Sequence, residues 1–470
     1  MLAATLLLPL QACAASPENP NIVFILVDDM GYGDPGCFNP ESKISTPHID
    51  SLAEAGMRFT DAHAPGPLCH MSRYGLLTGR YPFRTDVSDW RERPLIDEDQ
   101  MTIASLLQGQ GYQTAMVGKW HVGFAENGYE NPLPGGPVDR GFDSYFGIRA
   151  STDIPPYFYI RGDHAVQPPT DHIAANNSDG WSPVQGAFWR AGGIAPDLKL
   201  KDVLPRFTDE AITVIENADR DKPLFLYLAY PAPHTPWLPS AEFKGRSEVG
   251  MYGDFLMMVD AMVGRVLKAL DDAGLAENTL LFFSSDNGPM WYDSDAVRFG
   301  HDSSGGLRGM KGDAWEGGHR MPFIVRWPGK VKSGTTSEET ICFTDLMATF
   351  AAVVNTPLPS GAGSDSFNFL PELLGEQPNK QAVRDQLAIQ SANGYMTLRV
   401  GPWKYIDGLG SGGFTKPNRI KPTPDGPKGQ LYNLDDDPGE MKNLYLDNPN
   451  VVDRMKSTLA HIQQAEQTRP

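Results

Sequence analysis

The chain has 470 residues, of which 40% are hydrophobic and 21% charged, and its formal net charge is −18. This length and composition predict a large hydrophobic core, with one large domain and a smaller one. Nucleic-acid binding requires a basic surface, so the acidic balance argues against a nucleic-acid partner. Any anion-binding site must therefore be a local basic pocket within an acidic body.

Residues 1–16 read as an export leader. The apolar run from Met1 to Ala15 is too short to remain in a bilayer as a transmembrane helix. The leader is either cleaved as an ordinary signal peptide or carries a lipid on Cys13, and the sequence is compatible with both. In either case we expect an exported protein, periplasmic, secreted or lipid-anchored at the cell surface, with no transmembrane segment in the mature chain. The cysteines beyond the leader, Cys37, Cys69 and Cys342, are too few for a disulfide framework.

Two buried strands are predicted, at residues 21–27 and 279–285, and the first is an uninterrupted apolar run, which is typical of a parallel strand buried on both faces. Each is followed by polar residues: Asp28 and Asp29 after the first, and Asp286 and Asn287 after the second. Open α/β sheets bind ligands at the carboxyl ends of their strands. If the two strands are neighbours, these residues offer only oxygen ligands, which suit Ca²⁺ or, less well, Mg²⁺. Taken alone, the aspartate pair could equally be a helix cap and a turn residue.

A short helix is expected to begin at Cys69, because the preceding Pro/Gly-rich residues 64–68 cannot be helical and Gly79 is a natural C-terminal stop. The free N–H groups and the dipole at a helix start favour an anion and lower a thiol pKa. Arg73 lies one turn further along the helix. The pattern indicates a nucleophile beside an anion site, although a cysteine at such a junction can also be merely small and half-buried.

Further cationic side chains follow other predicted strands. Lys119 and His121 come after a strand at 113–117, and on an extended segment they would share one face. His234 lies in a proline-rich loop after a strand, which would hold it for proton transfer, and Lys311 lies in a glycine-rich segment. Each could instead be an ordinary surface or core residue. If these segments converge with Arg73 on the oxygen ligands, the site would suit a tetrahedral oxyanion ester.

The fold class predicted is α/β: a large doubly wound, mostly parallel sheet flanked by helices, and a smaller C-terminal α+β subdomain with an antiparallel sheet. We assign residues 17–370 to the catalytic domain and 371–470 to the subdomain, in which we find no catalytic constellation. Between residues 124 and 200 the sequence is irregular. Aromatic and basic side chains there are expected either to select the ligand or to pack on the body: Tyr157, Tyr159, Arg161, His164, Trp181, Trp189 and Arg190.

Seven short motifs follow one another along the chain. They are Asp28-Asp29, Cys69-x-x-x-Arg73 with Leu77-Thr78-Gly79-Arg80, Gly118-Lys119-Trp120-His121, Pro233-His234-x-Pro236, Asp286-Asn287-Gly288, Lys311-x-x-x-x-Glu316-Gly317-Gly318-x-Arg320-x-Pro322, and Leu431-Tyr432-Asn433-Leu434 with Asp437-Pro438-x-Glu440-x-x-Asn443-Leu444. With these motifs in this order, the chain resembles the type I formylglycine-dependent sulfatases, which are arylsulfatase-like members of the alkaline phosphatase superfamily. Each motif is weak alone, but their number and order make the resemblance specific.

The resemblance implies that a formylglycine-generating enzyme oxidises Cys69 to formylglycine, whose hydrate attacks sulfur beside a divalent cation. The implied metal ligands are Asp28, Asp29, Asp286, Asn287 and the modified residue 69. His234 would protonate the leaving alcohol and His121 would accept a proton when sulfate is expelled. Lys311 would contact the sulfate, and Arg73 and Lys119 would hold the modified residue and the sulfate, so that Lys119, His121, His234 and Lys311 form the substrate-binding set.

One position departs from the family pattern: Met71 stands where proline or alanine is usual in the motif that begins at Cys69. We expect modification of Cys69 because every other motif is present. The predicted activity is hydrolysis of sulfate esters, with a sulfated carbohydrate or polysaccharide fragment as substrate. Two alternatives are a phosphonate or phosphate ester hydrolase of the same superfamily, and a sulfated-glycan-binding protein without catalysis.

Overall fold

The structure is a computed structural model that describes residues 19–377 and 381–469. The predicted leader, including Cys13, lies outside the described residues. Within these two ranges, no helix is both long enough and apolar enough to cross a membrane. The three cysteines of the described ranges, Cys37, Cys69 and Cys342, are all free thiols.

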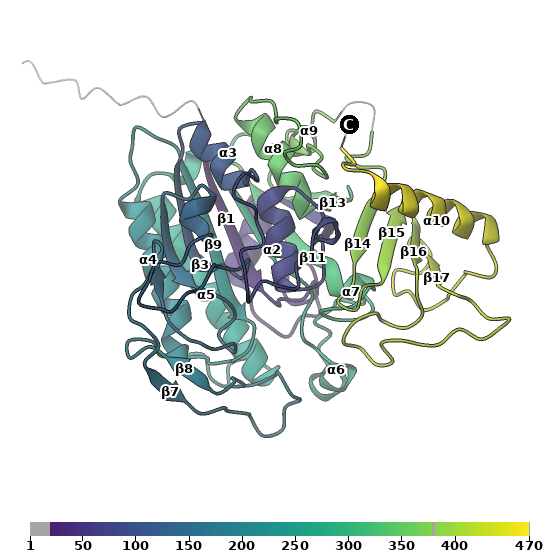
Figure 1. Cartoon of the computed structure of the whole chain (residues 1–470), viewed down its shortest axis with the longest axis horizontal. Helices are drawn as coiled ribbons and strands as arrows, with labels where there is room; N and C mark the ends of the chain where they lie inside the picture. Colours follow the sequence, from purple (N-terminus) through teal and green to yellow (C-terminus); the bar gives the residue numbers. More distant parts are fainter. Residues whose placement is uncertain (1–18, 378–380, 470) are drawn as a thin grey trace, which may run out of the picture.

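The main sheet of the described chain has eleven strands in the order β12-β2-β11-β10-β1-β9-β3-β4-β5-β6, with β13 beside β2 (Figure 1). Its central strands β4, β3, β9, β1 and β10 are parallel, whereas β11 is antiparallel to both β10 and β2. The strands are β1 (Asn21–Asp28), β2 (Met57–His63), β3 (Gln113–Lys119), β4 (Ser144–Ile148), β5 (Ile160–Arg161), β6 (His164–Ala165), β9 (Leu224–Pro233), β10 (Thr279–Ser285), β11 (Arg320–Arg326), β12 (Thr335–Ser337) and β13 (Ile341–Cys342).

Helices flank this sheet in two groups, each packed within itself: α1, α4 and α5 form one, and α2, α3 and α8 the other. This arrangement confirms the predicted fold class. The helices are α1 (Pro47–Ala55), α2 (Cys69–Thr78), α3 (Ile103–Gly109), α4 (Val203–Glu216), α5 (Gly250–Asp272), α6 (Asp293–Phe299), α7 (Glu316–His319), α8 (Leu346–Val353) and α9 (Leu370–Leu373).

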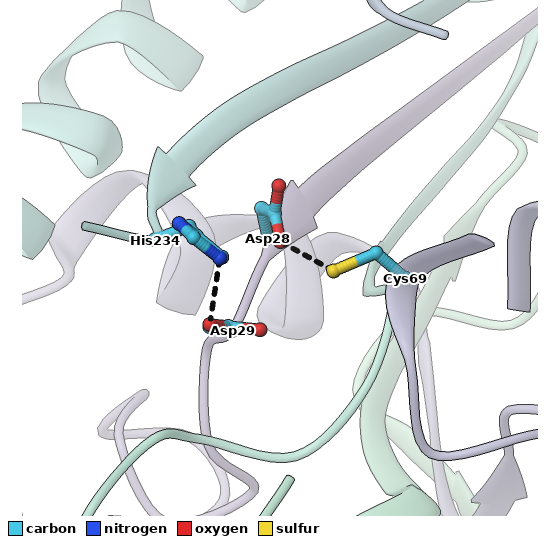
Figure 2. A group of neighbouring side chains, drawn as sticks. All are labelled: Asp28, Asp29, Cys69 and His234. Carbon is cyan, nitrogen blue, oxygen red and sulfur yellow. Dashed lines mark hydrogen bonds and ion pairs between the residues drawn. The ribbon is translucent and has the colours of Figure 1, made fainter. Parts of the chain in front are cut away.

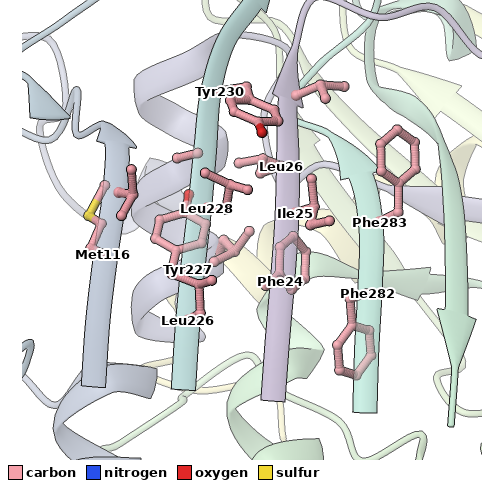
Figure 3. Close-up of a cluster of buried hydrophobic side chains, with 14 of the residues drawn as sticks. Phe24, Ile25, Leu26, Met116, Leu226, Tyr227, Leu228, Tyr230, Phe282 and Phe283 are labelled. Carbon is pink, nitrogen blue, oxygen red and sulfur yellow. The ribbon is translucent and has the colours of Figure 1, made fainter. Parts of the chain in front are cut away.

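The core lies where the central strands are covered on both faces. Every side chain from Ile22 to Val27 is fully buried, and Phe24 stacks on Phe282 of the neighbouring strand with ring centroids 5.6 Å apart. Figure 3 shows the apolar side chains of β3, β9, β1 and β10 packed across these strands. A strand buried on both faces must be apolar throughout, so the first polar residues fall where the strand leaves the core.

An antiparallel sheet, as predicted, forms the C-terminal part together with a closing helix, and this sheet has four strands. Its elements are β14 (Leu387–Gln390), β15 (Met396–Val400), β16 (Trp403–Ile406), β17 (Gln430–Asn433) and α10 (Pro449–Gln464). It is tied to α7 by a buried ion cluster in which Lys404 Nζ lies 2.9 Å from both Glu316 Oε1 and Glu440 Oε1. The division of the chain at residues 370 and 371 stays a prediction.

The irregular region between residues 124 and 200 contains the small β7 (Asp171–Ile173) and β8 (Gly192–Ile194) pair besides β4, β5 and β6. Its aromatic side chains mostly pack on the body. Tyr157 and Tyr159 are buried, and the Trp181 ring lies 4.8 Å from that of Trp237. Packing is therefore the main role of these residues.

Candidate active site

The acidic residues predicted at two strand ends lie side by side. β1 and β10 are parallel neighbours with Val27 opposite Ser285, so Asp28 and Asp286 leave the sheet at the same edge. The backbone N–H of Asp286 donates to the Val27 carbonyl over 3.0 Å. The prediction that the two strands are neighbours is confirmed. The four predicted oxygen ligands are all buried: Asp28, Asp29, Asp286 and Asn287.

The polar atoms at this edge form a possible metal site. One ligand atom from each of Asp28, Asp29, Cys69 and His234 lies within 4.8 Å of the others, and Figure 2 shows these side chains converging. The Asn287 side-chain N–H donates to Asp29 Oδ1 over 2.6 Å, but Asn287 Oδ1 is buried and accepts no hydrogen bond from any described residue. An unpaired buried carbonyl oxygen is costly, and a cation ligated by oxygen would satisfy it.

Helix α2 brings Cys69 and Arg73 to the same place. It begins at Cys69 and ends at Gly79, whose φ of 65° is left-handed, as the sequence predicts. The Arg73 guanidinium donates to Asp286 Oδ2 over 2.8 and 3.0 Å and to the Lys119 carbonyl over 2.9 Å. The Cys69 thiol donates to Asp28 Oδ1 over 3.4 Å. Arg73 thus ties α2 to β10 and β3, while Cys69 faces the carboxylates.

The expectation that the helix start lowers the thiol pKa is wrong. Complete burial, together with the negative charges of Asp28 and Asp286, raises the pKa of Cys69 well above its usual range. The Lys119 and Lys311 charges oppose this effect without reversing it. An unmodified Cys69 is therefore a neutral thiol and a poor nucleophile.

Two lysines neutralise the carboxylates. Lys119 Nζ forms an ion pair with Asp28, and Lys311 Nζ lies 2.7 Å from Asp29 Oδ1 and 3.2 Å from Cys69 Sγ. Burial alone would raise the pKa of Asp28, but Lys119, His234 and Arg73 outweigh it and hold that pKa well below its usual value. Gly118, the residue before Lys119, allows β3 to lie close to β9, because a Cβ at this position would lie 2.0 Å from the Ala229 carbonyl of β9.

The histidines differ in their partners. His234 Nδ1 donates to the Thr235 carbonyl over 2.7 Å, so its Nε2 points to Asp29 at 3.6 Å. His121 is buried, and neither ring nitrogen has a hydrogen-bond partner in the described chain. Burial, followed by the charges of Lys119 and other neighbours, holds the pKa of His121 well below its usual value. His121 is therefore neutral near pH 7 and able to accept a proton.

The expectation that Lys119 and His121 share a face is wrong. β3 ends at Lys119, and His121 has a left-handed φ of 59°, which turns the chain away from the extended course. Lys119 is fully buried against Asp28, whereas His121 lines the open cavity. Of the two side chains, only that of His121 lines the cavity.

A cavity of about 680 Å³ opens over Cys69. Asp29, His121, His234 and Lys311 line it together with Cys69, while the predicted residues Arg73 and Lys119 lie fully buried behind them. Arg190 is the one residue among the aromatic and basic side chains named between 124 and 200 that lines this cavity in the described chain. The sequence analysis missed other wall residues, among them His70, Trp90, Arg91, Asp153 and Tyr292, and from the C-terminal part Asn393, Phe414, Lys416 and Asn418.

The C-terminal part thus takes part in the site, which the sequence analysis did not expect. It also holds the loop that carries Lys311. The N–H of Ala392 donates to the Gly312 carbonyl over 2.9 Å, and the N–H of Ala314 donates to the Ser411 carbonyl over 2.7 Å. From the other side, the Gly312 N–H donates to the Pro67 carbonyl over 2.8 Å. The Lys311 loop is therefore fixed between the approach to Cys69 and the C-terminal part.

An α/β sheet with buried carboxylates, buried lysines and two histidines at its strand ends is typical of metal-dependent hydrolases of anionic esters. The comparisons agree with this class. The sulfatase family model matches residues 20–356. The N-acetylgalactosamine-6-O-sulfatase of Bacteroides thetaiotaomicron is 33% identical, over 95% of this chain and 93% of the relative. Human arylsulfatase A is 34% identical, over 94% of this chain and 86% of the relative.

A solved structure from work on the metabolism of multiple glycosaminoglycans by Bacteroides thetaiotaomicron has a TM-score of 0.81 and 31% sequence identity, covering 96% of this chain and 100% of that one. The chain therefore belongs to the sulfatase family, as its motifs predicted, and it is a sulfuric ester hydrolase.

Proposed function

We propose that this sulfatase is exported and removes sulfate from carbohydrates, using a formylglycine formed from Cys69 and a bound divalent cation, preferably Ca²⁺. The observation that carries the proposal is the position of Cys69. Its Sγ lies 3.4 Å from Asp28 Oδ1 and 3.2 Å from Lys311 Nζ, at the floor of the cavity. Residue 69 therefore contacts both a candidate metal ligand, Asp28, and the Lys311 ammonium, which can bind a sulfate oxygen.

Asp28, Asp29, Asp286, Asn287 and residue 69 are the groups that would hold the cation. When bound there, a divalent cation supplies Lewis-acid stabilisation of negative charge, and formylglycine supplies the hydroxyl nucleophile that a neutral thiol does not. An all-oxygen set of protein ligands is the reason for preferring Ca²⁺.

The charges at the site favour an anionic substrate. Three carboxylates (Asp28, Asp29, Asp286) are balanced by three basic side chains (Arg73, Lys119, Lys311) that contact them. A divalent cation would leave the buried site with excess positive charge, which an anionic sulfate group would neutralise. Among these three basic side chains, that of Lys311 lines the cavity, so we propose that Lys311 binds the sulfate group of the substrate.

The two histidines have the properties that proton transfer requires. The bond from His234 Nδ1 to the Thr235 carbonyl leaves Nε2 directed into the cavity, so protonated His234 can donate from Nε2 to the departing alcohol oxygen. Neutral His121, with both nitrogens unpaired among the described residues, can accept the proton released when sulfate is expelled. Arg73 and Lys119 orient the carboxylates and the start of α2 from behind.

A carbohydrate substrate is supported by the relatives, one of which is named for N-acetylgalactosamine 6-O-sulfate, and by the size of the cavity. We expect sulfate release from sulfated oligosaccharides, with a kcat/KM at least about tenfold above that for the matching phosphate esters, because relatives that match most of this chain are named as sulfatases. Ion chromatography of sulfate and phosphate measures both. Faster phosphate release, or activity on a small aryl sulfate but on no glycan in the panel, would contradict the proposal.

The cation has its own test. Dialysis against a chelator should lower kcat by at least about tenfold, because the developing charge loses its Lewis acid, and added Ca²⁺ should restore it. Removal should also lower the melting temperature, because a cation that binds only the folded protein stabilises it. Full activity in a protein shown by elemental analysis to be metal-free would exclude a catalytic cation.

A further inference from the structure

The mouth of the cavity carries positive charges that sulfate hydrolysis itself does not use. Arg91, Arg190 and Lys416 all line it. Arg190 is paired with Asp153. The side chains of Arg91 and Lys416 are exposed and form no ion pair or hydrogen bond with any residue that the structure describes. Two free cations at one opening are unusual in a chain with a net charge of −18, and they would attract a second anionic group.

Arg91 is placed beside the reactive centre by aromatic packing. Its guanidinium carbon lies 4.5 Å from the centroid of the Trp90 ring. The same ring meets the His121 ring edge to face at 4.2 Å. Trp90 therefore separates Arg91 from the proposed proton acceptor by one ring, and the guanidinium remains free to form paired hydrogen bonds with a carboxylate or sulfate.

Lys416 is placed by a fixed turn of the C-terminal part. Both the Phe414 and Thr415 N–H groups donate to Asp313 Oδ1, over 2.7 and 3.1 Å. The Phe414 ring packs on Gly312, where a Cβ would lie 3.2 Å from the ring. Phe414 is nevertheless 39% exposed and offers an apolar face to a sugar ring. Lys416 thus belongs to an ordered wall next to the Lys311 loop.

The opening leads to space for further sugar units. A second cavity, of about 860 Å³, lies between α6 and the C-terminal part and shares Tyr292, Phe414 and Lys416 with the first. Two carboxylates, Asp293 and Asp302, line this second cavity together with Arg308, whose guanidinium already donates to the Glu440 carbonyl. A second anionic group therefore fits the shared mouth better than the depth of the second cavity.

We propose that Arg91 and Lys416 bind a second anionic group, a sulfate or a carboxylate, on the sugar unit next to the one that loses its sulfate. The substrate is then an acidic oligosaccharide and not a singly charged monosaccharide sulfate. This inference rests on the proposed function for the ester that is cleaved, but the binding preference itself does not require turnover.

The test uses three disaccharides that share one sulfate ester: one with a neutral neighbouring unit, one with a second sulfate there, and one with a carboxylate there. Affinities are measured by calorimetry with the Cys69→Ala variant, and kcat/KM with the unsubstituted enzyme. We expect at least about tenfold tighter binding of one of the doubly charged compounds, a preference that weakens as salt is added. The compound preferred identifies sulfate or carboxylate as the group recognised.

The double variant R91E/K416E should lose that preference, lowering the ratio of the doubly to the singly charged substrate by about tenfold in both affinity and kcat/KM. The matched control is K421E, an exposed lysine of the same segment that does not line the cavity. Equal affinity for all three disaccharides, or a preference that survives the double variant, would overturn the inference. Preferential binding without sulfate release from any ester would support it and contradict the proposed function.

Discussion

Replacing Cys69 with alanine should lower kcat/KM for every sulfate ester by at least about 10⁴-fold, because residue 69 supplies the group that attacks sulfur and no other side chain replaces it. The fold should be retained. The thiol contacts only Asp28 and Lys311 among the described polar groups, and both keep their other partners. Steady-state kinetics with an aryl sulfate and a sulfated disaccharide measure the loss, and thermal unfolding reports on the fold.

Cys37→Ala is the matched control, since Cys37 is a free, half-buried thiol that does not line the cavity; its activity should be unchanged. Mass spectrometry of the peptide that contains residue 69 tests the modification separately. An active preparation in which that peptide carries only the thiol would contradict formylglycine. Substantial activity in Cys69→Ala would contradict the whole assignment of the site.

Replacing His234 with glutamine should lower kcat/KM for carbohydrate sulfates by about 10²- to 10⁴-fold, because a sugar alkoxide is a poor leaving group and needs the proton that His234 Nε2 donates. Glutamine keeps polarity and approximate size but cannot supply a proton. When the substrate is an aryl sulfate of an acidic phenol, the phenolate leaves without that proton. The decrease in kcat/KM for such a substrate should therefore be much smaller. Kinetics with a series of leaving alcohols and phenols of graded pKa measure the difference.

The control for this substitution is His172→Gln, an exposed histidine in β7. It should leave the rates for all leaving groups unchanged. An equal loss for good and poor leaving groups in the His234 variant would assign His234 to binding or metal ligation instead of proton donation. Metal ligation is a realistic alternative role for His234, because its ring lies close to the same carboxylates as Cys69.

The polar residues at the two strand ends, which are the candidate oxygen ligands, could be predicted because local sequence determines where the strands end. β1 is apolar from Ile22 to Val27 and β10 from Leu280 to Phe283, and charged residues in strands buried on both faces fall where the strand leaves the core. Asp28 and Asp286 mark those points. The start of α2 at Cys69 was likewise predictable from the prolines before it and from Gly79 at its end. The existence of β2 and β14 was missed, because each is short and carries polar residues among the apolar ones.

The thiol pKa and the cavity wall could not be predicted, because they depend on residues that meet only in the folded chain. The helix start alone predicts a lowered pKa for Cys69, yet burial and two carboxylates from other elements raise it. Trp90 and Lys416 lie in irregular segments without periodicity, so no local pattern indicates that they face the cavity. Lys119 and His121 are one residue apart, but the left-handed conformation of His121 ends the extended course, and His121 lines the cavity whereas Lys119 does not.

The hydrogen bonds that hold the Lys311 loop have a consequence for protein engineering. A Cβ at Gly413 would lie 2.2 Å from the Gly312 carbonyl, so the two chain segments touch backbone to backbone next to the lysine assigned to sulfate. The region after residue 370 is therefore not a module that can be exchanged freely between relatives. A hybrid could take this region from another member of the family. It would gain that member's substrate preference only if the transplanted region carried a glycine at the position of Gly413, so that the close contact with Gly312 is restored.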